Sequence, residues 1–336
     1  MTSNRRIELV CPAGHLPSLR AAVDNGADCV YIGLRDNTNA RNFSGLNFDL
    51  RAAAEGVRYA HGRQAKVFLA INTYPQPGSW SRWTRAIDSA AELGIDAVIV
   101  ADPGLMRYAT QTHPQLRLHL SVQGSATNYE AINLYHRHFN IRRAVLPRVL
   151  SVAQVEQVVR NTPVEIEVFG FGSLCVMVEG RCALSSYVTG ESPNMAGACS
   201  PGKAVRWEQK PDGLEARLNG VLINKYAPQE NAAYPTICKG RYTAGEETYY
   251  AIEEPASLNA MELLPDLHRI GIAAIKIEGR QRSPSYVAAV TRVWRNALDA
   301  YFASGAHQPQ PEWTATLRDV SEGQCHTLGA YHRPWK

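Results

Sequence analysis

The stretch AVIVADPGLMRYATQT, residues 97–112, contains one complete strand-to-helix unit of this sequence. Residues 97–102 are short, mostly apolar and rich in β-branched side chains, as expected for a parallel strand covered on both faces. Asp102 then provides a helix N-cap, and Pro103 fits the first helical position, where no backbone N–H donor is needed. The stretch therefore predicts a strand at 97–102 followed directly by a helix at 103–112.

The same unit recurs along the chain, which has further short apolar runs and further segments of helical periodicity. Eight strands with helices between them favour a closed (β/α)8 barrel, the TIM-like fold, and an open doubly wound sheet is the alternative. The predicted strands lie at 7–12, 29–34, 66–72, 97–102, 118–123, 143–148, 165–172 and 273–279. The predicted helices lie at 16–25, 50–61, 81–93, 103–112, 128–138, 151–161 and 283–304.

About 100 residues separate the seventh predicted strand from the eighth, and this gap interrupts the rhythm of strands and helices. We expect barrel strands 1–7 within residues 1–172, a cysteine-rich insertion at 173–260, the eighth strand and the closing helix at 261–305, and a C-terminal tail at 306–336. The insertion is expected to contain a pair of β-strands and then a helix from Ser257. The tail contains prolines and is expected to pack as irregular chain.

The composition is that of an ordinary globular protein, with 45% hydrophobic residues among 336 and a formal net charge of +4. A charge this small does not by itself argue for nucleic acid, and we expect no nucleic-acid partner. No segment approaches the roughly 20 apolar residues that a membrane-spanning helix requires. The N-terminus lacks the apolar run of a signal peptide. We therefore expect a cytoplasmic protein that does not span a membrane.

Four of the seven cysteines are clustered within residues 175–238. The odd total and the missing secretion signal argue against a disulfide framework. Four thiols in a glycine-rich insertion favour a metal site, and an iron–sulfur cluster is preferred to zinc because paired C-x-x-C motifs are missing. Inert buried thiols and a catalytic thiol are the alternatives, although no histidine lies between 139 and 267 as a local base. The candidate ligands are Cys175, Cys182, Cys199 and Cys238, whereas structural roles are expected for Cys11, Cys29 and Cys325.

Polar side chains fall at the predicted carboxyl ends of the strands, where barrels of this kind carry their chemistry. Three arginines among them suggest an anionic or carboxylate-bearing small molecule. The predicted carboxylate-binding residues are Arg41, Arg148 and Arg280. The residues predicted to orient substrate or relay protons are Asn39, Asn72, Gln123 and Glu278. Of these two sets, the candidates for a catalytic role are Arg148, Glu278 and Arg280.

The stretch EVFGFGSLCVMVEGRCALS, residues 167–185, fits the signature of the collagenase-like peptidase family, peptidase family U32, at every position. The matching positions are Glu167, Phe169, Gly172, Ser173, Leu174, Cys175, Gly180, Cys182, Leu184 and Ser185. Within the family, the chain closely resembles members that act in ubiquinone biosynthesis. This second resemblance runs through stretches such as DNTNARNFSGLNF (36–48), GACSPGKAVRW (197–207) and YPTICKGRY (234–242).

The resemblance implies a 4Fe–4S cluster held by four cysteines that match Cys175, Cys182, Cys199 and Cys238. It also implies oxygen-independent hydroxylation of the aromatic ring of ubiquinone precursors. The implied partners are the related protein UbiV, in a heterodimer, and a UbiT-like lipid carrier. Other family members hydroxylate tRNA or ribosomal RNA and are linked to prephenate, so prephenate is a candidate oxygen donor here.

Three other functions are weighed against ring hydroxylation of a quinone precursor. A prephenate-dependent tRNA or rRNA hydroxylase predicts a broad basic face and an added RNA-binding region. A protease requires a nucleophile and a base, and the sequence offers no convincing pair. A scaffold or electron-transfer subunit would leave the catalytic pocket to a partner. For the cluster itself, electron transfer is preferred to Lewis-acid chemistry, because four cysteines on four irons leave none open.

Overall fold

The protein was analysed as a computed structural model, which describes residues 6–333. Eight parallel strands form its central sheet: β1 (Glu8–Pro12), β2 (Cys29–Gly33), β3 (Lys66–Ile71), β4 (Ala97–Val100), β5 (Leu118–Leu120), β6 (Arg143–Val145), β7 (Glu165–Ser173) and β14 (Ala274–Ile277). The sheet closes because β14 pairs with both β1 and β7. The predicted (β/α)8, TIM-like barrel is therefore confirmed.

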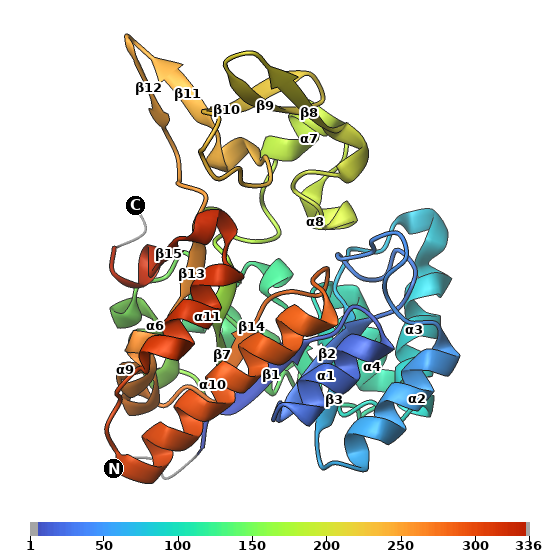
Figure 1. The fold of residues 1–336 in the computed structure, drawn as a ribbon. Helices are drawn as coiled ribbons and strands as arrows, with labels where there is room; N and C mark the ends of the chain where they lie inside the picture. The colour runs from blue at the N-terminus through green and yellow to red at the C-terminus, as the bar shows by residue number, and fades with distance from the viewer. Residues whose placement is uncertain (1–5, 334–336) are drawn as a thin grey trace.

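Helices surround this barrel (Figure 1): α1 (Leu16–Asp24), α2 (Leu50–His61), α3 (Trp80–Glu92), α4 (Pro103–Thr112), α5 (Tyr129–Phe139), α6 (Val152–Arg160) and α10 (Pro284–Ser304). All seven were predicted, with ends that differ by one residue at most. The capping signals behave as expected, since the Asp102 carboxylate accepts a hydrogen bond from Leu105 N at 2.8 Å. Apolar side chains between strands and helices form the main core, in which Trp294 of α10 is fully buried.

Most of the segment between β7 and β14 forms a lobe beyond the end of the barrel (Figure 1). Its antiparallel strands and short helices are β8 (Val205–Lys210), β9 (Gly213–Leu218), β10 (Val221–Tyr226), β11 (Arg241–Ala244), β12 (Glu247–Tyr250), α7 (Leu184–Thr189) and α8 (Pro193–Ala196). Three strands pair where two were predicted, because Asn219 and Gly220 turn the chain between β9 and β10. Both have positive φ, 46° and 85°, which suits a tight hairpin turn.

Two local predictions in the later part of the chain are wrong. The segment from Ser257 is a strand, β13 (Ser257–Asn259), which pairs antiparallel with the end of β7, and helix α9 spans Leu264–Ile270. The tail is ordered as α11 (Pro311–Asp319) and β15 (His326–Thr327), which pairs with β13. Both strands arise from long-range pairing that the local pattern of side chains does not reveal.

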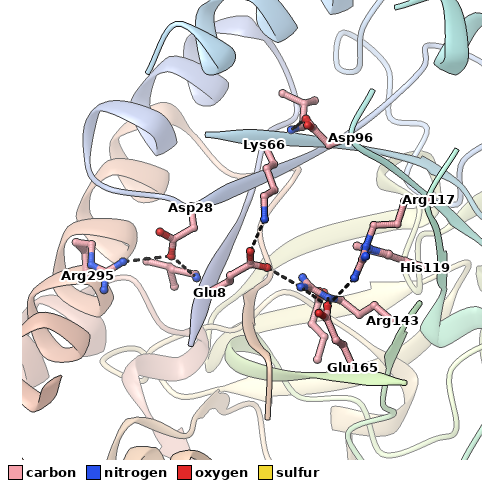
Figure 2. A network of polar contacts seen from close by, with 12 residues as sticks. Glu8, Asp28, Lys66, Asp96, Arg117, His119, Arg143, Glu165 and Arg295 are labelled. Carbon is pink, nitrogen blue, oxygen red and sulfur yellow. Dashed lines mark hydrogen bonds and ion pairs between the residues drawn. The ribbon is translucent and has the colours of Figure 1, made fainter. Parts of the chain in front are cut away.

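Charged side chains fill the barrel where its strands begin (Figure 2). Glu8 contacts Lys66 Nζ at 2.6 Å and Arg143 Nη2 at 2.5 Å, and Arg143 also pairs with Glu165 at 2.8 Å. Deeper in the barrel Lys276 pairs with Glu167. This end is therefore closed by ion pairs, and the opposite end is left for a site. Among the described residues, no helix is both long and apolar enough to cross a membrane.

Candidate functional site

Arg148 lies just beyond β6, at the carboxyl end of the barrel, and its guanidinium is buried. Nε donates to Glu179 Oε1 at 2.8 Å, and Nη1 donates to Ser173 O at 2.6 Å and to Glu278 Oε2 at 2.5 Å. The guanidinium also stacks over Phe169, 4.1 Å from the ring centroid. Arg148 is thus bound by two carboxylates of the protein and ties the insertion to the strand ends.

Glu278 follows β14 and links Arg148 to Arg41, whose Nη2 lies 3.6 Å from Glu278 Oε1. Burial alone would raise the pKa of the Glu278 carboxyl, but the charges of Arg148 and Arg41 outweigh it and hold that pKa below its usual range. Arg41 also donates to the carbonyl of Gly197 in the insertion. A chain of alternating charges therefore runs from Glu179 through Arg148 and Glu278 to Arg41.

Arg280 differs from the other two arginines because, among residues 6–333, it makes no ion pair. Its side chain is 5% exposed, and Nη1 donates to Asn39 Oδ1 at 3.2 Å. Burial is the main cause that lowers the pKa of Arg280 to about 10, and the charge of nearby Arg41 contributes to the decrease. Tyr31 and Glu278 act on this pKa in the opposite direction. A buried cation without a carboxylate partner is a natural binding group for an anion.

The three predicted amide residues differ in what holds their side chains. Asn39 donates to Leu34 O, and Asn72 accepts from Ala40 N at 3.0 Å, so both order the loop after β2. Gln123 is buried, and its Oε1 has no hydrogen-bond partner within the described chain. The same holds for Oε2 of buried Glu179. Both atoms are therefore buried acceptors that lack a donor among the described residues.

The four clustered cysteines are free thiols that affect one another electrostatically. Burial, followed by the charge of Glu179, raises the pKa of Cys175 to about 12, and Cys199 contributes to the rise. Burial likewise raises the pKa of Cys238 to about 11, and Cys199 and Cys182 add to it. Burial also raises the pKa of Cys199, with a contribution from Cys182. All four thiols therefore share one neighbourhood beside the strand ends.

The fit of this neighbourhood to a metal group depends on the kind of group. Among the described residues, no three His, Cys, Asp or Glu side chains are placed to hold a metal ion. Four thiolates that each bind a different iron need not converge on a single point, so the donor set suits an iron–sulfur cluster in residue type and number. Gly172 and Gly180, with φ of 136° and 91°, let the chain turn beside Cys175 and Cys182. Ligation by these cysteines stays a prediction.

Two site residues were missed by sequence reasoning. Glu179 is the first, and its only signal was a carboxylate within the glycine- and cysteine-rich signature stretch. Lys239 is the second: it is 3% exposed, forms an ion pair with Glu322 and lies 3.4 Å from Ser173 Oγ. Its position next to Cys238 was the available signal, but its distant partners could not be read from the sequence.

Together these features define a TIM-like barrel protein in which a cysteine-bearing insertion lies over arginines at the carboxyl ends of the strands. The family model described as "Peptidase family U32" matches residues 14–334. The chain belongs to this family, as its signature stretch predicts.

The chain is similar over most of its length to several characterised or named relatives. It is 32% identical to "Uncharacterized protease MJ0090" of Methanocaldococcus jannaschii, covering 97% of this chain and 73% of the relative. It is 30% identical to "tRNA hydroxylation protein P" of Escherichia coli, covering 95% and 72%. It is 29% identical to "23S rRNA 5-hydroxycytidine C2501 synthase" of Escherichia coli, covering 89% of this chain and 40% of that protein.

Proposed function

We propose that this chain is the iron–sulfur subunit of an oxygen-independent hydroxylase, with a 4Fe–4S cluster held by Cys175, Cys182, Cys199 and Cys238. The observation that carries the proposal is the grouping of four free thiols near Arg41, Arg148 and Glu278 at the carboxyl end of the barrel. Hydroxylation without dioxygen requires redox chemistry that side chains lack, and the cluster would supply electrons. The names of two relatives support hydroxylation as the reaction class.

Different residues of the chain bind the substrate, orient it and support the site. Arg280 binds a carboxylate of the substrate or of a prephenate-like oxygen donor, because its charge is not already paired. Arg148 and Glu278 hold the strand ends in place through their mutual ion pair. Gln123 and Glu179 offer acceptor atoms that orient a hydroxyl group.

For the substrate, we propose an aromatic precursor of ubiquinone, with this chain in the role of UbiU. The support is the resemblance of its motif stretches to members that act in ubiquinone biosynthesis. This role brings with it a heterodimer with UbiV and contact with a UbiT-like lipid carrier. It also places the protein in the cytoplasm.

The second candidate substrate is a tRNA or ribosomal RNA base, with prephenate as the oxygen donor. The relatives support this substrate class more directly than the quinone, because two of them are named for RNA hydroxylation. The mild net charge of +4 gives this candidate no added electrostatic support.

A protease receives little support from the hydrogen bonds of the described residues. One serine–histidine–asparagine grouping exists: His326 Nε2 lies 2.8 Å from Ser321 Oγ, and Nδ1 lies 3.3 Å from Asn259 Nδ2. The Ser321 hydroxyl, however, donates its proton to Leu317 O at 2.7 Å. His326 must then donate to Ser321 and accept from Asn259, which is the reverse of the proton transfer that activates a serine nucleophile.

The cofactor is tested on protein purified without oxygen. We expect a brown protein with about four irons and four sulfides per chain, and an EPR signal after reduction. Cys175→Ala should lose these features, whereas the exposed Cys325→Ala should keep them as the matched control. A colourless wild-type protein with one zinc per chain would contradict the cofactor.

The substrate is tested in a deletion strain grown without oxygen. Mass spectrometry should find an accumulated, unhydroxylated quinone precursor and unchanged nucleosides in tRNA and rRNA. Wild-type protein should restore the quinone, and Arg280→Gln should not. A missing hydroxylated nucleoside together with normal quinone would instead assign the RNA substrate.

A further inference from the structure

The insertion lies against the barrel at Gly197, which follows α8. This glycine has φ of 73°, and a Cβ added to it would overlap Ala40 O. The backbones of the insertion and of the loop after β2 are therefore in direct contact. No residue other than glycine fits here without displacement of one of the two segments.

Arg41 holds this contact from the barrel side. Its Nη1 donates to Gly197 O, and its Nη2 faces Glu278, which is in turn paired with Arg148. Its backbone is fixed as well, since Arg41 N donates to Asn39 Oδ1 at 3.0 Å and Arg41 O accepts from Asn47 Nδ2 at 2.8 Å. The side chain is 23% exposed, so it is the least enclosed part of the charged chain.

This contact lies next to one of the four clustered cysteines in the sequence. Gly197 is two residues before Cys199, whose segment lacks regular structure after α8. Each of two other cysteine segments has a comparable attachment: Arg148 binds Ser173 O ahead of Cys175, and Lys239 binds Glu322 beside Cys238. For the Cys199 segment, the attachment is Arg41.

We propose that Arg41 is a positioning residue that fastens the Cys199 segment to the strand ends through Gly197, and so sets the place of the third cysteine relative to the other three. The role as a cluster ligand rests on the proposed function, whereas the fastening of the segment does not. Arg41 therefore acts through Cys199, and it is Arg280 that is left to bind an anion.

The fastening is tested first on the full chain without iron, by hydrogen exchange monitored at residues 195–201. In Arg41→Ala the amides of this segment should exchange at least about tenfold faster, as expected for the loss of one charge-assisted hydrogen bond. Arg41→Lys should show a smaller increase because it keeps one donor. Arg20→Ala, which removes a surface ion pair with Glu55 at 2.7 Å, is the matched control and should not change this segment. Unchanged exchange in Arg41→Ala would overturn the proposal.

The consequence for the cluster is tested on iron-loaded protein. Arg41→Ala should release iron to a chelator about tenfold faster than wild type, and the EPR spectrum of its reduced cluster should change. Arg41→Lys should partly restore both, and Arg20→Ala should match wild type. Gly197→Ala should reproduce the Arg41→Ala result from the other side of the contact. An unaltered EPR spectrum and iron-release rate in both Arg41→Ala and Gly197→Ala would overturn the positioning role. A wild-type protein without iron would refute the proposed cofactor, and the hydrogen-exchange result would then decide the fastening alone.

Discussion

At the scale of single residues, Arg148 and Arg280 show how one residue type at one end of a barrel can have two different environments. Both are buried and both follow a strand. Arg148 is saturated by Glu179 and Glu278, whereas Arg280 has Asn39 as its polar partner. The sequence correctly predicts that both arginines follow a strand, but it does not reveal that one is paired with carboxylates and the other is not. The difference depends on carboxylates that are 31 and 130 residues away from Arg148 in the chain.

Arg280→Gln should abolish carboxylate binding without loss of stability. The wild-type fold contains an unpaired buried charge, so its removal relieves a desolvation cost, and we expect the free energy of unfolding to stay equal or to rise by about 1 kcal/mol. Prephenate should raise the melting temperature of wild type and leave that of Arg280→Gln unchanged, as mass action requires for a ligand of the folded state. Glu278→Gln, which removes a carboxylate from paired Arg148, is the contrasting variant and should lose about 3 kcal/mol. Equal thermal shifts in wild type and Arg280→Gln would contradict the assignment.

At the scale of elements, the sequence predicts what is local and periodic. Eight strands and seven helices were found because each carries its own apolar pattern and, at α4, its own capping residues. Strand β13 was mistaken for a helix because its identity depends on pairing with the end of β7, more than 80 residues earlier. The same reason explains β15, which exists through its pairing with β13. The positions of the polar residues at the strand ends were predictable because they follow from the strand pattern, whereas the ion pairs between those residues were not.

The strand beginnings give a prediction with a definite pH dependence. Burial opposes ionisation of Glu8, but Arg143 and Lys66 outweigh it and lower the pKa of its carboxyl to about 2 (Figure 2). A folded-state pKa below the unfolded value means that the stabilisation is complete above about pH 4.5 and is lost as pH falls toward 2. Solvent screening of this partly exposed group limits it to about 1–2 kcal/mol.

Unfolding of wild type and Glu8→Gln should therefore be compared between pH 2.5 and 7. The difference in unfolding free energy should be largest and constant above pH 5 and should shrink steadily below it. Glu55→Gln, which alters a surface pair with Arg20, is the control and should show a small difference at every pH. A Glu8→Gln difference that is independent of pH would show that shape, not charge, explains the effect.

At the scale of the whole molecule, the main hydrophobic core and the four clustered thiols are distinct sets of residues. The main hydrophobic core of the described residues contains Cys11 but none of the four clustered cysteines. The small core of the insertion is formed by Val205, Leu218 and Ile223 with a few partly buried neighbours. The insertion and the barrel are joined by polar contacts at Arg41, Arg148 and Lys239. They are also joined by Leu174 and Val178, which flank Cys175 and belong to the main core.

This division predicts two separable responses to damage. Removal of iron by a chelator should leave the barrel's unfolding transition unchanged, because the core does not contain the four clustered thiols. It should also speed hydrogen exchange at 173–204, because this segment loses its bound metal. Leu69→Ala, a fully buried change in β3, should do the reverse: it should cost about 2–5 kcal/mol of barrel stability while the iron content per folded chain stays at the wild-type level. Calorimetry and exchange on the same samples measure both. If iron removal instead unfolds the barrel cooperatively, the stability of the barrel depends on the thiol site, which would contradict the division.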